Sequence, residues 1–443
     1  MRILWLCNII IPAIARELGL GHSVREGWLS GYHGQLLADG HAELAVCFPY
    51  FGREMTRALT ARVEGEALGD GRVARFKIDK MLCYAFRENI NTPERYDGGL
   101  EGQMSCILAD FRPDIIHIFG SEFPHALAMA RVCGEPERLL LSMQGLMGKC
   151  AEAYMAGLPA PVISSATFRD VIRRDMIVRQ QEKFLRRAAH EQTLFARLRH
   201  VAGRTDFDRE AAHELNPALS YHHLGESLRA PFYQGRWERE KCQPHSIFLS
   251  QGDYPIKGFH HMLAALAVIL RDFPSAHLYV AGNSIIGRPG RSDLAGKIKD
   301  RVKLSAYGRH ILALLSAHQL TDKVTMLGKL DDEAMKERYL ASSVFVCPSA
   351  VENSPNSLGE AMLLGVPVVA AAVGGIPSLL DDGKEGLLYQ AGSSDDLAAA
   401  IKNAWDSQTA MRISAGAAKR AATTHDRVQN YRRLMEIYEE IST

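Results

Sequence analysis

Short apolar runs rich in β-branched residues alternate along this chain with longer segments of helical period. The alternation is typical of parallel strands joined by crossover helices, because each buried strand needs a helix to cover the sheet. In the first half, strands are predicted at residues 2–7, 44–48, 73–78, 114–119, 139–143 and 201–203, and the clearest helices at 28–37, 94–111 and 165–189. In the second half, strands are predicted at 246–250, 276–281, 323–327, 344–347 and 367–370. We therefore predict an α/β fold with two sheets.

A polar, charge-dense stretch at residues 234–244 separates the two halves. It has a glycine near one end and a proline at the other, and apolar periodicity lapses within it. We predict a first domain of residues 1–236 and a second of residues 237–424. The last helix, 425–443, has apolar residues at helical spacing and is expected to pack back on the first domain. Ligands of open parallel sheets bind beyond the carboxyl ends of the strands, so we expect a site in a cleft between the domains.

Composition limits the classes of partner. The chain has 443 residues, of which 47% are hydrophobic, and this is far too many for a disordered protein. The 52 Lys and Arg nearly balance the 51 Asp and Glu, so no global field attracts nucleic acid. The eight cysteines show no close pair at zinc-ligand or CxxC spacing. We expect buried thiols in a reducing compartment, the cytoplasm.

Two apolar stretches resemble export or membrane signals. Residues 1–15 begin with one Arg and an apolar run, but Asn8 and Pro12 interrupt it, as in a buried strand followed by a loop. Residues 361–380 carry no charge and are long enough to span a bilayer. Three glycines and two prolines divide this second stretch into helix end, turn, strand and turn. We predict no transmembrane helix.

The most informative segment runs from Pro348 to Pro367, where an apolar strand leads into a polar turn and then a helix. Glu352 and Glu360 flank the turn, and Pro355 prevents one continuous helix through both. The free N–H groups and the dipole at such a helix start suit a phosphate, while a carboxylate one turn further in can accept hydrogen bonds from a ribose diol. Alternatively, Glu360 only complements the helix dipole.

The surroundings of these carboxylates resemble the donor-binding region of the retaining glycosyltransferases of family 4 (glycosyl transferases group 1). The shared pattern is Glu-x7-Glu after an apolar strand, then Ala-Met-Leu-Leu-Gly-Val-Pro, and it covers nearly all of residues 246–400. Other matching pieces are Lys257-Gly258-Phe259, Val280-Ala281-Gly282, Gly374-Gly375-Ile376-Pro377 and, more loosely, Pro113-Asp114-Ile115-Ile116-His117. The resemblance implies the GT-B fold, in which two Rossmann-like parallel-sheet domains face each other across a cleft.

The resemblance also implies roles for individual residues. Glu360 would hold the ribose hydroxyls, and the amides of Asn356 and Ser357 would meet the diphosphate. Glu352 would lie beside the transferred sugar. Lys257 matches the lysine that neutralises the leaving diphosphate, where a cation is needed because negative charge builds up as the glycosidic bond breaks. Alternatively, Lys257 is a solvated lysine at a helix start.

Two further donor-side positions are less regular. The family usually has an arginine six residues before the lysine, and this chain has Gln251 there. A neutral amide cannot supply the bidentate, charge-assisted pair that arginine gives a phosphate. Either Arg288 or Arg291 replaces it, or donor binding is weakened. Leu330 matches a position whose backbone meets the nucleotide base.

His117 ends a predicted strand and matches a histidine common at that point in the family. We predict a catalytic role on the acceptor side, and the alternative is a core histidine. The family often has two further histidines in this region, where this chain has Phe119 and Gln144.

Residues 160–200 form a locally basic stretch. It contains nine Lys or Arg against four Asp or Glu, with apolar residues between the charges. Such a stretch either lies on an anionic membrane or is a solvated helix face packed on its own domain. The first alternative predicts peripheral contact with the inner face of the membrane.

The leading hypothesis is a retaining hexosyltransferase. It would move a sugar from a nucleotide diphosphate sugar to a hydroxyl of a growing polysaccharide or lipid-linked glycan. The resemblance implies that cationic side chains and helix termini meet the donor's charge, so no metal or cofactor is expected. One alternative keeps the fold and changes the reaction to that of a phosphorylase or a nucleotide-sugar epimerase. Another is a carbohydrate-binding protein with a decayed catalytic site, which Gln251 favours and the presence of both Glu352 and Glu360 argues against.

Overall fold

The computed structural model describes residues 1–20, 27–62, 66–79, 81–286 and 304–442. The chain divides into two compact units. The first unit holds Met1–Gly148, Phe184–Arg229 and His425–Thr443, and the second holds Lys149–Lys183 and Ala230–Thr424. Residues 149–183, which the sequence placed in the first domain, therefore group with the second unit. Each unit is described by itself.

The first unit is built on a nine-stranded sheet in the order β3-β4-β5-β2-β1-β6-β7-β8-β9. Its strands are β1 (Arg2–Cys7), β2 (Glu43–Tyr50), β3 (Glu66–Leu68), β4 (Val73–Ile78), β5 (Met81–Arg87), β6 (Ile115–Phe119), β7 (Leu139–Ser142), β8 (His200–Gly203) and β9 (Ser220–His223). Strands β3, β4 and β5 pair antiparallel at one edge, and the remaining pairs are parallel. The strand order reverses between β1 and β6, and ligands of such sheets bind at this topological switch point.

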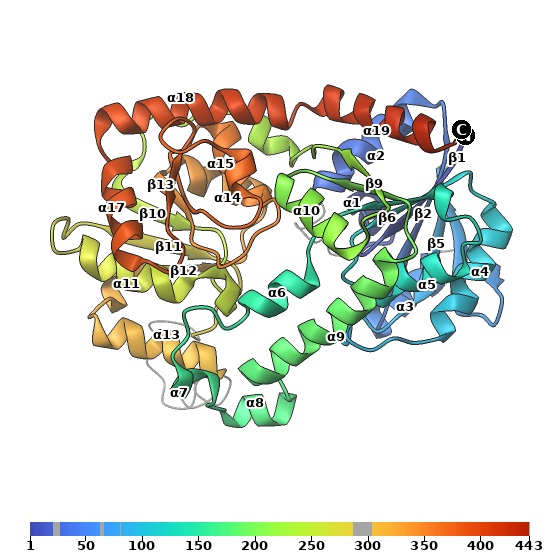
Figure 1. Cartoon of the computed structure of the whole chain (residues 1–443), viewed down its shortest axis with the longest axis horizontal. Coiled ribbons are helices and arrows are strands. Elements are labelled where there is room, and N and C mark those ends of the chain that lie inside the picture. Colours follow the sequence, from blue (N-terminus) through green and yellow to red (C-terminus); the bar gives the residue numbers. More distant parts are fainter. Residues whose placement is uncertain (21–26, 63–65, 80, 287–303, 443) are drawn as a thin grey trace. The chain divides into compact units, whose positions relative to one another are not determined.

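Helices cover both faces of this sheet (Figure 1). Along β1, Ile3, Trp5 and Cys7 belong to one hydrophobic core cluster, and Leu4 and Leu6 belong to the other. The helices of this unit include α1 (Pro12–Glu17), α2 (Gly27–Asp39), α3 (Arg53–Arg62), α4 (Gly99–Phe111), α5 (Pro124–Val132), α10 (Asp206–Leu215) and α19 (Arg427–Ser442). A strand buried on both faces needs an apolar residue at every position, and this explains the continuous apolar run at the start of the sequence.

Helix α19, the last in the chain, is part of the core of the first unit. Its Tyr438 is fully buried, and the Tyr438 hydroxyl accepts a hydrogen bond from Trp5 Nε1 at 2.9 Å. Leu434 and Ile437 on the same helix are also fully buried in this core. The apolar side of α19 therefore covers the face of the sheet on which Trp5 of β1 lies.

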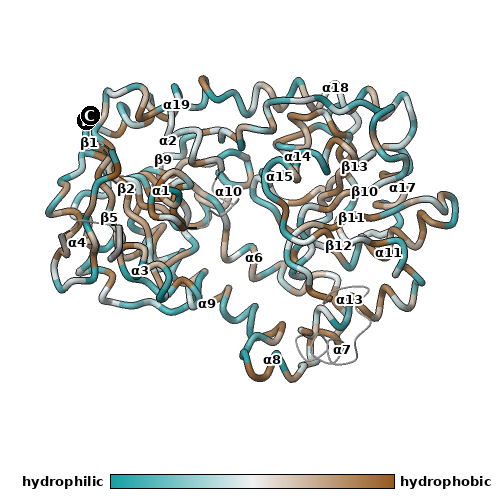
Figure 2. The backbone as a smooth tube through the Cα atoms, turned by 180° about the vertical axis from the view of Figure 1, so that it is seen from behind, coloured by the Kyte–Doolittle hydropathy of each residue, from teal (hydrophilic) through white to brown (hydrophobic). Residues whose placement is uncertain are grey.

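The second unit contains a six-stranded sheet in the order β12-β11-β10-β13-β14-β15, and all of its strand pairs are parallel. Its strands are β10 (Gln243–Leu249), β11 (His277–Ala281), β12 (Val324–Gly328), β13 (Ser342–Cys347), β14 (Val368–Ala371) and β15 (Leu387–Tyr389). The order reverses between β10 and β13, so the switch point of this sheet lies between these two strands. Figure 2 shows hydrophobic residues concentrated on the strands, which are buried inside the unit.

Helices surround this second sheet. They are α11 (Phe259–Ile269), α13 (Ala306–Ala317), α14 (Asp332–Leu340), α15 (Asn356–Leu364), α16 (Ile376–Leu379), α17 (Ser394–Ala404) and α18 (Ser407–Thr424). The segment 149–183 adds α7 (Ala160–Ile163) and α8 (Phe168–Arg173). Helices α6 (Met147–Ala153) and α9 (Ile177–Phe195) begin in one unit and end in the other.

The stretch at 165–189, predicted as one helix, forms two helices in the structure. Helix α8 begins after Thr167, whose side chain accepts a hydrogen bond from the Asp170 N–H while the Asp170 side chain accepts one from the Thr167 N–H. Helix α8 ends at Arg174, which has a left-handed backbone (φ 52°). Helical periodicity alone did not reveal this break, because arginine is an ordinary helix residue.

All eight cysteines are free, and five of them are buried. Among the described helices, none is both long and apolar enough to cross a membrane. The residues at 361–380 instead form the end of α15, β14 and α16, as their glycines and prolines predicted.

Candidate functional site

Lys257 and Glu352 meet at the switch point of the second sheet. Lys257 follows β10, Glu352 follows β13, and these strands are neighbours in the sheet. The Lys257 Nζ lies 2.5 Å from Glu352 Oε1, and the Ser349 hydroxyl donates to the same oxygen at 2.6 Å. The two charged side chains are only 20% and 12% exposed. A largely buried ion pair therefore occupies the place where ligands of parallel sheets bind.

The ion pair keeps Lys257 positively charged. Burial of Lys257 disfavours the ammonium form, but the Glu352 carboxylate and Tyr254 oppose this effect, and the net result is a pKa above the ordinary value for lysine. Lys257 is therefore a cation at neutral pH, as the neutralisation of a diphosphate requires.

Two glycines allow the loops that carry these residues to approach each other. A Cβ on Gly258 (φ +69°) would lie 1.9 Å from the carbonyl oxygen of Pro348, and one on Gly374 (φ +52°) would lie 2.0 Å from the carbonyl oxygen of Glu352. The Gly375 N–H also donates to the Glu352 carbonyl at 3.0 Å. Larger residues at either position would displace the loop behind the ion pair. This explains why glycines follow Lys257 and β14.

Helix α15 begins at Asn356, shortly after Glu352 in the sequence. No side chain caps its N-terminus. Its first intrahelical hydrogen bond runs from the Leu358 N–H to the Pro355 carbonyl at 3.0 Å, so the amides of Asn356 and Ser357 lie ahead of it. Glu360, one turn further along, is buried, with 3% of its surface exposed. The helix start thus presents N–H groups and a positive dipole end to the same sheet edge.

Gln251 and Leu330 also follow strands of this sheet. Gln251 comes two residues after β10, and a Cβ on Gly282 at the end of β11 would lie 3.7 Å from Gln251 Cα and Cγ. Leu330 comes two residues after β12 and packs, partly buried, against the core. Arg288 and Arg291, the cations proposed to replace the missing arginine, lie outside the described residues.

His117 has a different setting, in the core of the first unit. It is fully buried on β6, with Nδ1 2.6 Å from the Tyr438 hydroxyl and Nε2 2.7 Å from the Ser142 hydroxyl. Burial lowers the pKa of His117 to about 3, so the ring stays neutral. Both nitrogens are occupied by core hydroxyls, which is the environment of a structural histidine. We therefore do not carry His117 into the proposed site.

Sequence reasoning missed a polar cluster at the switch point of the first sheet. Asn8, which follows β1, donates to Glu122 Oε2 at 3.0 Å, and its Oδ1 lies 3.0 Å from His125 Nε2. The other ring nitrogen of His125 lies 2.5 Å from Glu88 Oε2. Burial raises the pKa of Glu122. The available signal was that Asn8 and Glu122 follow adjacent strands of a parallel sheet.

Glu191 is another buried carboxyl group of the first unit, and it is bound by Ser121, the residue before Glu122. The Ser121 hydroxyl donates to Glu191 Oε1 at 2.5 Å, and the Met147 N–H donates to Oε2 at 2.9 Å. Burial raises the pKa of Glu191 from 4.5 to about 7, although these hydrogen bonds oppose the shift. The folded protein therefore binds a proton at Glu191 between these two pH values, where the unfolded chain does not.

We predict that Glu191 makes folding stability fall as pH rises from about 4.5 to about 7, because the unfolded state binds fewer protons there. Glu191→Gln removes this titration. The unfolding free energy of the variant relative to wild type should therefore increase with pH, by an amount on the order of 2 kcal/mol. Urea denaturation of both proteins at pH 5 and pH 7.5 measures it. A difference that does not change with pH would contradict the assignment.

One known protein family matches the part of the chain that holds Lys257, Glu352 and Glu360. Residues 236–421 match the family described as Glycosyl transferases group 1. This segment is less than half of the chain and lies within the second unit. The D-inositol 3-phosphate glycosyltransferase of Mycolicibacterium vanbaalenii is 30% identical over 173 residues, which cover 38% of this chain and 35% of the relative. The sulfoquinovosyl transferase SQD2 of Arabidopsis thaliana is 33% identical over 115 residues, or 24% of this chain and 22% of the relative. The first match thus spans about a third of the curated relative, and the second spans less.

Solved structures establish the fold over the whole chain. Sucrose-phosphate synthase from Thermosynechococcus elongatus superposes with a TM-score of 0.64, at 16% identity, over 100% of this chain and 99% of that one. Anabaena HepE in complex with UDP and glucose gives a TM-score of 0.64 at 18% identity, over 99% of this chain and 100% of that one. The chain therefore has the GT-B fold, with two Rossmann-like units, as the sequence predicted.

Proposed function

We propose that the protein is a hexosyltransferase that moves a sugar from a nucleotide diphosphate sugar to a hydroxyl group of a growing polysaccharide or a lipid-linked glycan. The observation that carries the proposal is the buried Lys257–Glu352 ion pair at the switch point of the second sheet. Both residues lie in the segment that matches Glycosyl transferases group 1. The relatives that match parts of the chain carry the names of glycosyltransferases.

The donor is proposed to bind with its diphosphate between Lys257 and the start of α15. The ammonium of Lys257 and the amides of Asn356 and Ser357 then meet the negative charge that develops on the leaving diphosphate. Glu360 accepts hydrogen bonds from the ribose, and Glu352 lies beside the sugar. The backbone at Leu330 meets the base, and Gln251 contacts the phosphates as a neutral donor.

Glu352 has a second task in this arrangement. In the structure, Glu352 is the counter-ion of Lys257. When a diphosphate binds, the lysine is shared between two anionic groups, and Glu352 is then placed to interact with positive charge developing on the sugar. Retention of anomeric configuration is part of the proposal and follows from the family resemblance alone.

On the acceptor side we propose Glu122 in place of His117. A carboxylate with a raised pKa holds a proton more readily than an ordinary glutamate, so it is suited to accept one from a sugar hydroxyl. Asn8 fixes one of its oxygens, and His125 in turn contacts Asn8.

The proposal predicts that a nucleoside diphosphate stabilises the protein in the presence of EDTA, since charge is met by Lys257 and helix amides. At a concentration a hundred times its dissociation constant, the bound nucleotide should add about 2.7 kcal/mol to the unfolding free energy. Thermal denaturation with a panel of nucleoside diphosphates identifies the base. If none of the panel stabilises the protein without added magnesium or manganese, the metal-independent mechanism is wrong.

Product analysis separates the proposed transferase from its alternatives. Incubation with the preferred nucleotide sugar and a glycan acceptor should release nucleoside diphosphate and extend the glycan. A phosphorylase would instead consume inorganic phosphate, and an epimerase would change the sugar without an acceptor. A decayed binding protein would bind nucleotide and release nothing.

A further inference from the structure

Helix α8 in the second unit exposes hydrophobic side chains on one face. Phe168, Val171 and Ile172 are spaced i, i+3, i+4, and are 68%, 62% and 64% exposed. This spacing places the three on the same side of the helix. Few other large hydrophobic residues among those described are as exposed. In Figure 2, α8 carries a hydrophobic stretch at the periphery of its unit.

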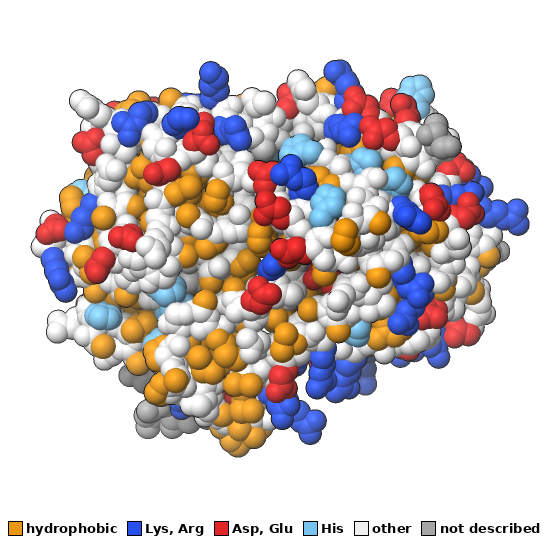
Figure 3. All heavy atoms as spheres, in the orientation of Figure 1, with side chains coloured by type: hydrophobic (Ala, Val, Ile, Leu, Met, Phe, Trp, Pro, Cys, Tyr) orange, Lys and Arg blue, Asp and Glu red, His pale blue; other side chains and the backbone are white. Residues whose placement is uncertain are grey.

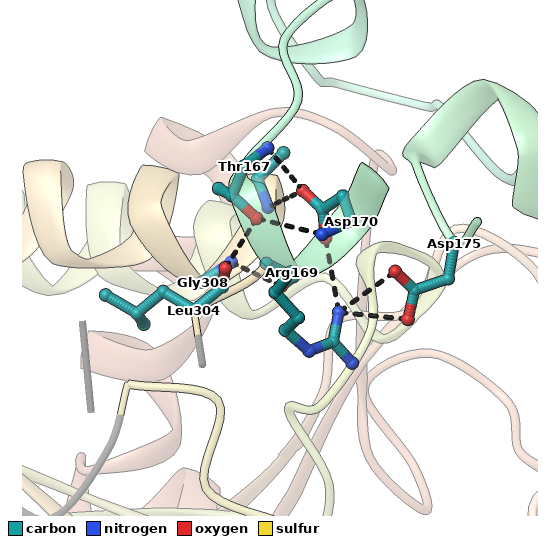
Figure 4. A network of polar contacts seen from close by, with 8 residues as sticks. Thr167, Arg169, Asp170, Asp175, Leu304 and Gly308 are labelled. Carbon is teal, nitrogen blue, oxygen red and sulfur yellow. Dashed lines mark hydrogen bonds and ion pairs between the residues drawn. The ribbon is translucent and has the colours of Figure 1, made fainter. Parts of the chain in front are cut away.

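The opposite side of α8 holds the helix in place with polar contacts (Figure 4). The Asp170 carboxylate, 1% exposed, accepts a hydrogen bond from the Ala306 N–H at the start of α13 at 2.8 Å. The Thr167 hydroxyl donates to the Leu304 carbonyl at 2.7 Å. Arg169 bridges Asp170 and Asp175, at 3.2 and 2.9 Å. Polar residues thus face the body of the unit and apolar residues face outward, the reverse of the usual pattern for a surface helix.

Acidic and basic side chains around α8 differ in exposure. Between residues 160 and 178 the acidic side chains are Asp170 and Asp175, and these are 1% and 17% exposed. Arg173 and Arg174, at the C-terminal end of α8, are both exposed. In Figure 3, hydrophobic side chains gather at the lower edge of the view, where Figure 1 has α8, and basic side chains lie next to them. The outward surface is therefore apolar and cationic.

We propose that α8 docks on an anionic lipid bilayer, with Phe168, Val171 and Ile172 inserted among the acyl chains and with Arg173 and Arg174 at the phosphate level. A bilayer accepts small apolar insertions when basic residues flank them. A six-residue helix is about 9 Å long, and this is too small for the roughly 800 Å² that each partner buries in a standard protein interface. The polar contacts to α13 fix the orientation of the helix before it reaches the membrane.

Binding to vesicles tests the proposal with the full chain and without turnover, so its outcome does not depend on the proposed reaction. The wild-type protein should sediment with phosphatidylcholine vesicles that contain about 30% phosphatidylglycerol, and much less with phosphatidylcholine alone. Phe168→Ser/Val171→Ser/Ile172→Ser should lower the bound fraction about tenfold, and Arg173→Glu/Arg174→Glu should do the same. The matched control is Met411→Ser/Val428→Ser, which removes side chains that are 55% and 59% exposed elsewhere and should bind like wild type.

A spectroscopic readout separates insertion from simple electrostatic contact. Phe168→Trp should shift its fluorescence emission to the blue when anionic vesicles are added, whereas Met411→Trp should not. Equal binding of the α8 triple variant and wild type would overturn the proposal, as would equal recovery of wild type with neutral and anionic vesicles. Absence of a shift for Phe168→Trp in vesicle-bound protein would also overturn insertion.

Discussion

Lys257→Ala should reduce turnover by at least about 100-fold, or roughly 2.7 kcal/mol of transition-state stabilisation. The Lys257 ammonium lies at the switch point where the diphosphate is proposed to bind, and Gln251 supplies no charge to share its task. The same change leaves the Glu352 carboxylate, 12% exposed, without its counter-ion. We therefore also expect the unfolding free energy to fall by about 3 kcal/mol.

Lys257→Arg and thermal denaturation separate these two effects. The arginine variant keeps a cation beside Glu352, so its stability should stay near that of wild type, and its turnover should lie between wild type and Lys257→Ala. Gln251→Arg should tighten nucleoside diphosphate binding if the site accommodates the guanidinium. An active enzyme in which Lys257→Ala is harmless would mean that the diphosphate is held elsewhere, and Arg288 or Arg291 would be the next residues to change.

Glu360→Ala should weaken nucleoside diphosphate binding by roughly 1.5 to 3 kcal/mol, which is about a 10- to 150-fold higher dissociation constant. The carboxylate is buried one turn into α15, where a charged acceptor of ribose hydrogen bonds contributes strongly. Calorimetry with the preferred nucleoside diphosphate measures the change. Glu333→Ala on α14 is a control, because this side chain is 64% exposed.

Glu360→Gln refines the test, since the amide keeps the size of the side chain and loses its charge. Its affinity should fall between those of wild type and Glu360→Ala. An unchanged dissociation constant in Glu360→Ala would show that the carboxylate only complements the dipole of α15.

The sequence by itself determined most of the architecture. Strands buried on both faces are continuous apolar runs, as in β1, and such runs stand out between amphipathic helices. Four strands of the described residues were not predicted from this pattern. Strands β3, β9 and β15 are only three or four residues long, and β5 pairs with β4 as an antiparallel hairpin that no turn motif announced. The donor-side motif could also be recognised in the sequence, because Pro355, Gly258 and Gly374 mark the turns that the site requires.

Tertiary structure decided what each polar residue contacts. Lys257 and Glu352 are 95 positions apart, and only the adjacency of β10 and β13 brings them to 2.5 Å. His117 looked like a site residue, but Tyr438, 321 positions away, closes over it as part of the core. Glu122 and Asn8 meet because the sheet order places β1 beside β6. For α8, the periodicity predicted a helix but not which side of it faces the unit. Contacts with the start of α13, more than 130 residues away, turn its polar side inward. Local sequence specifies local conformation, whereas pairing across the chain depends on how the whole core packs.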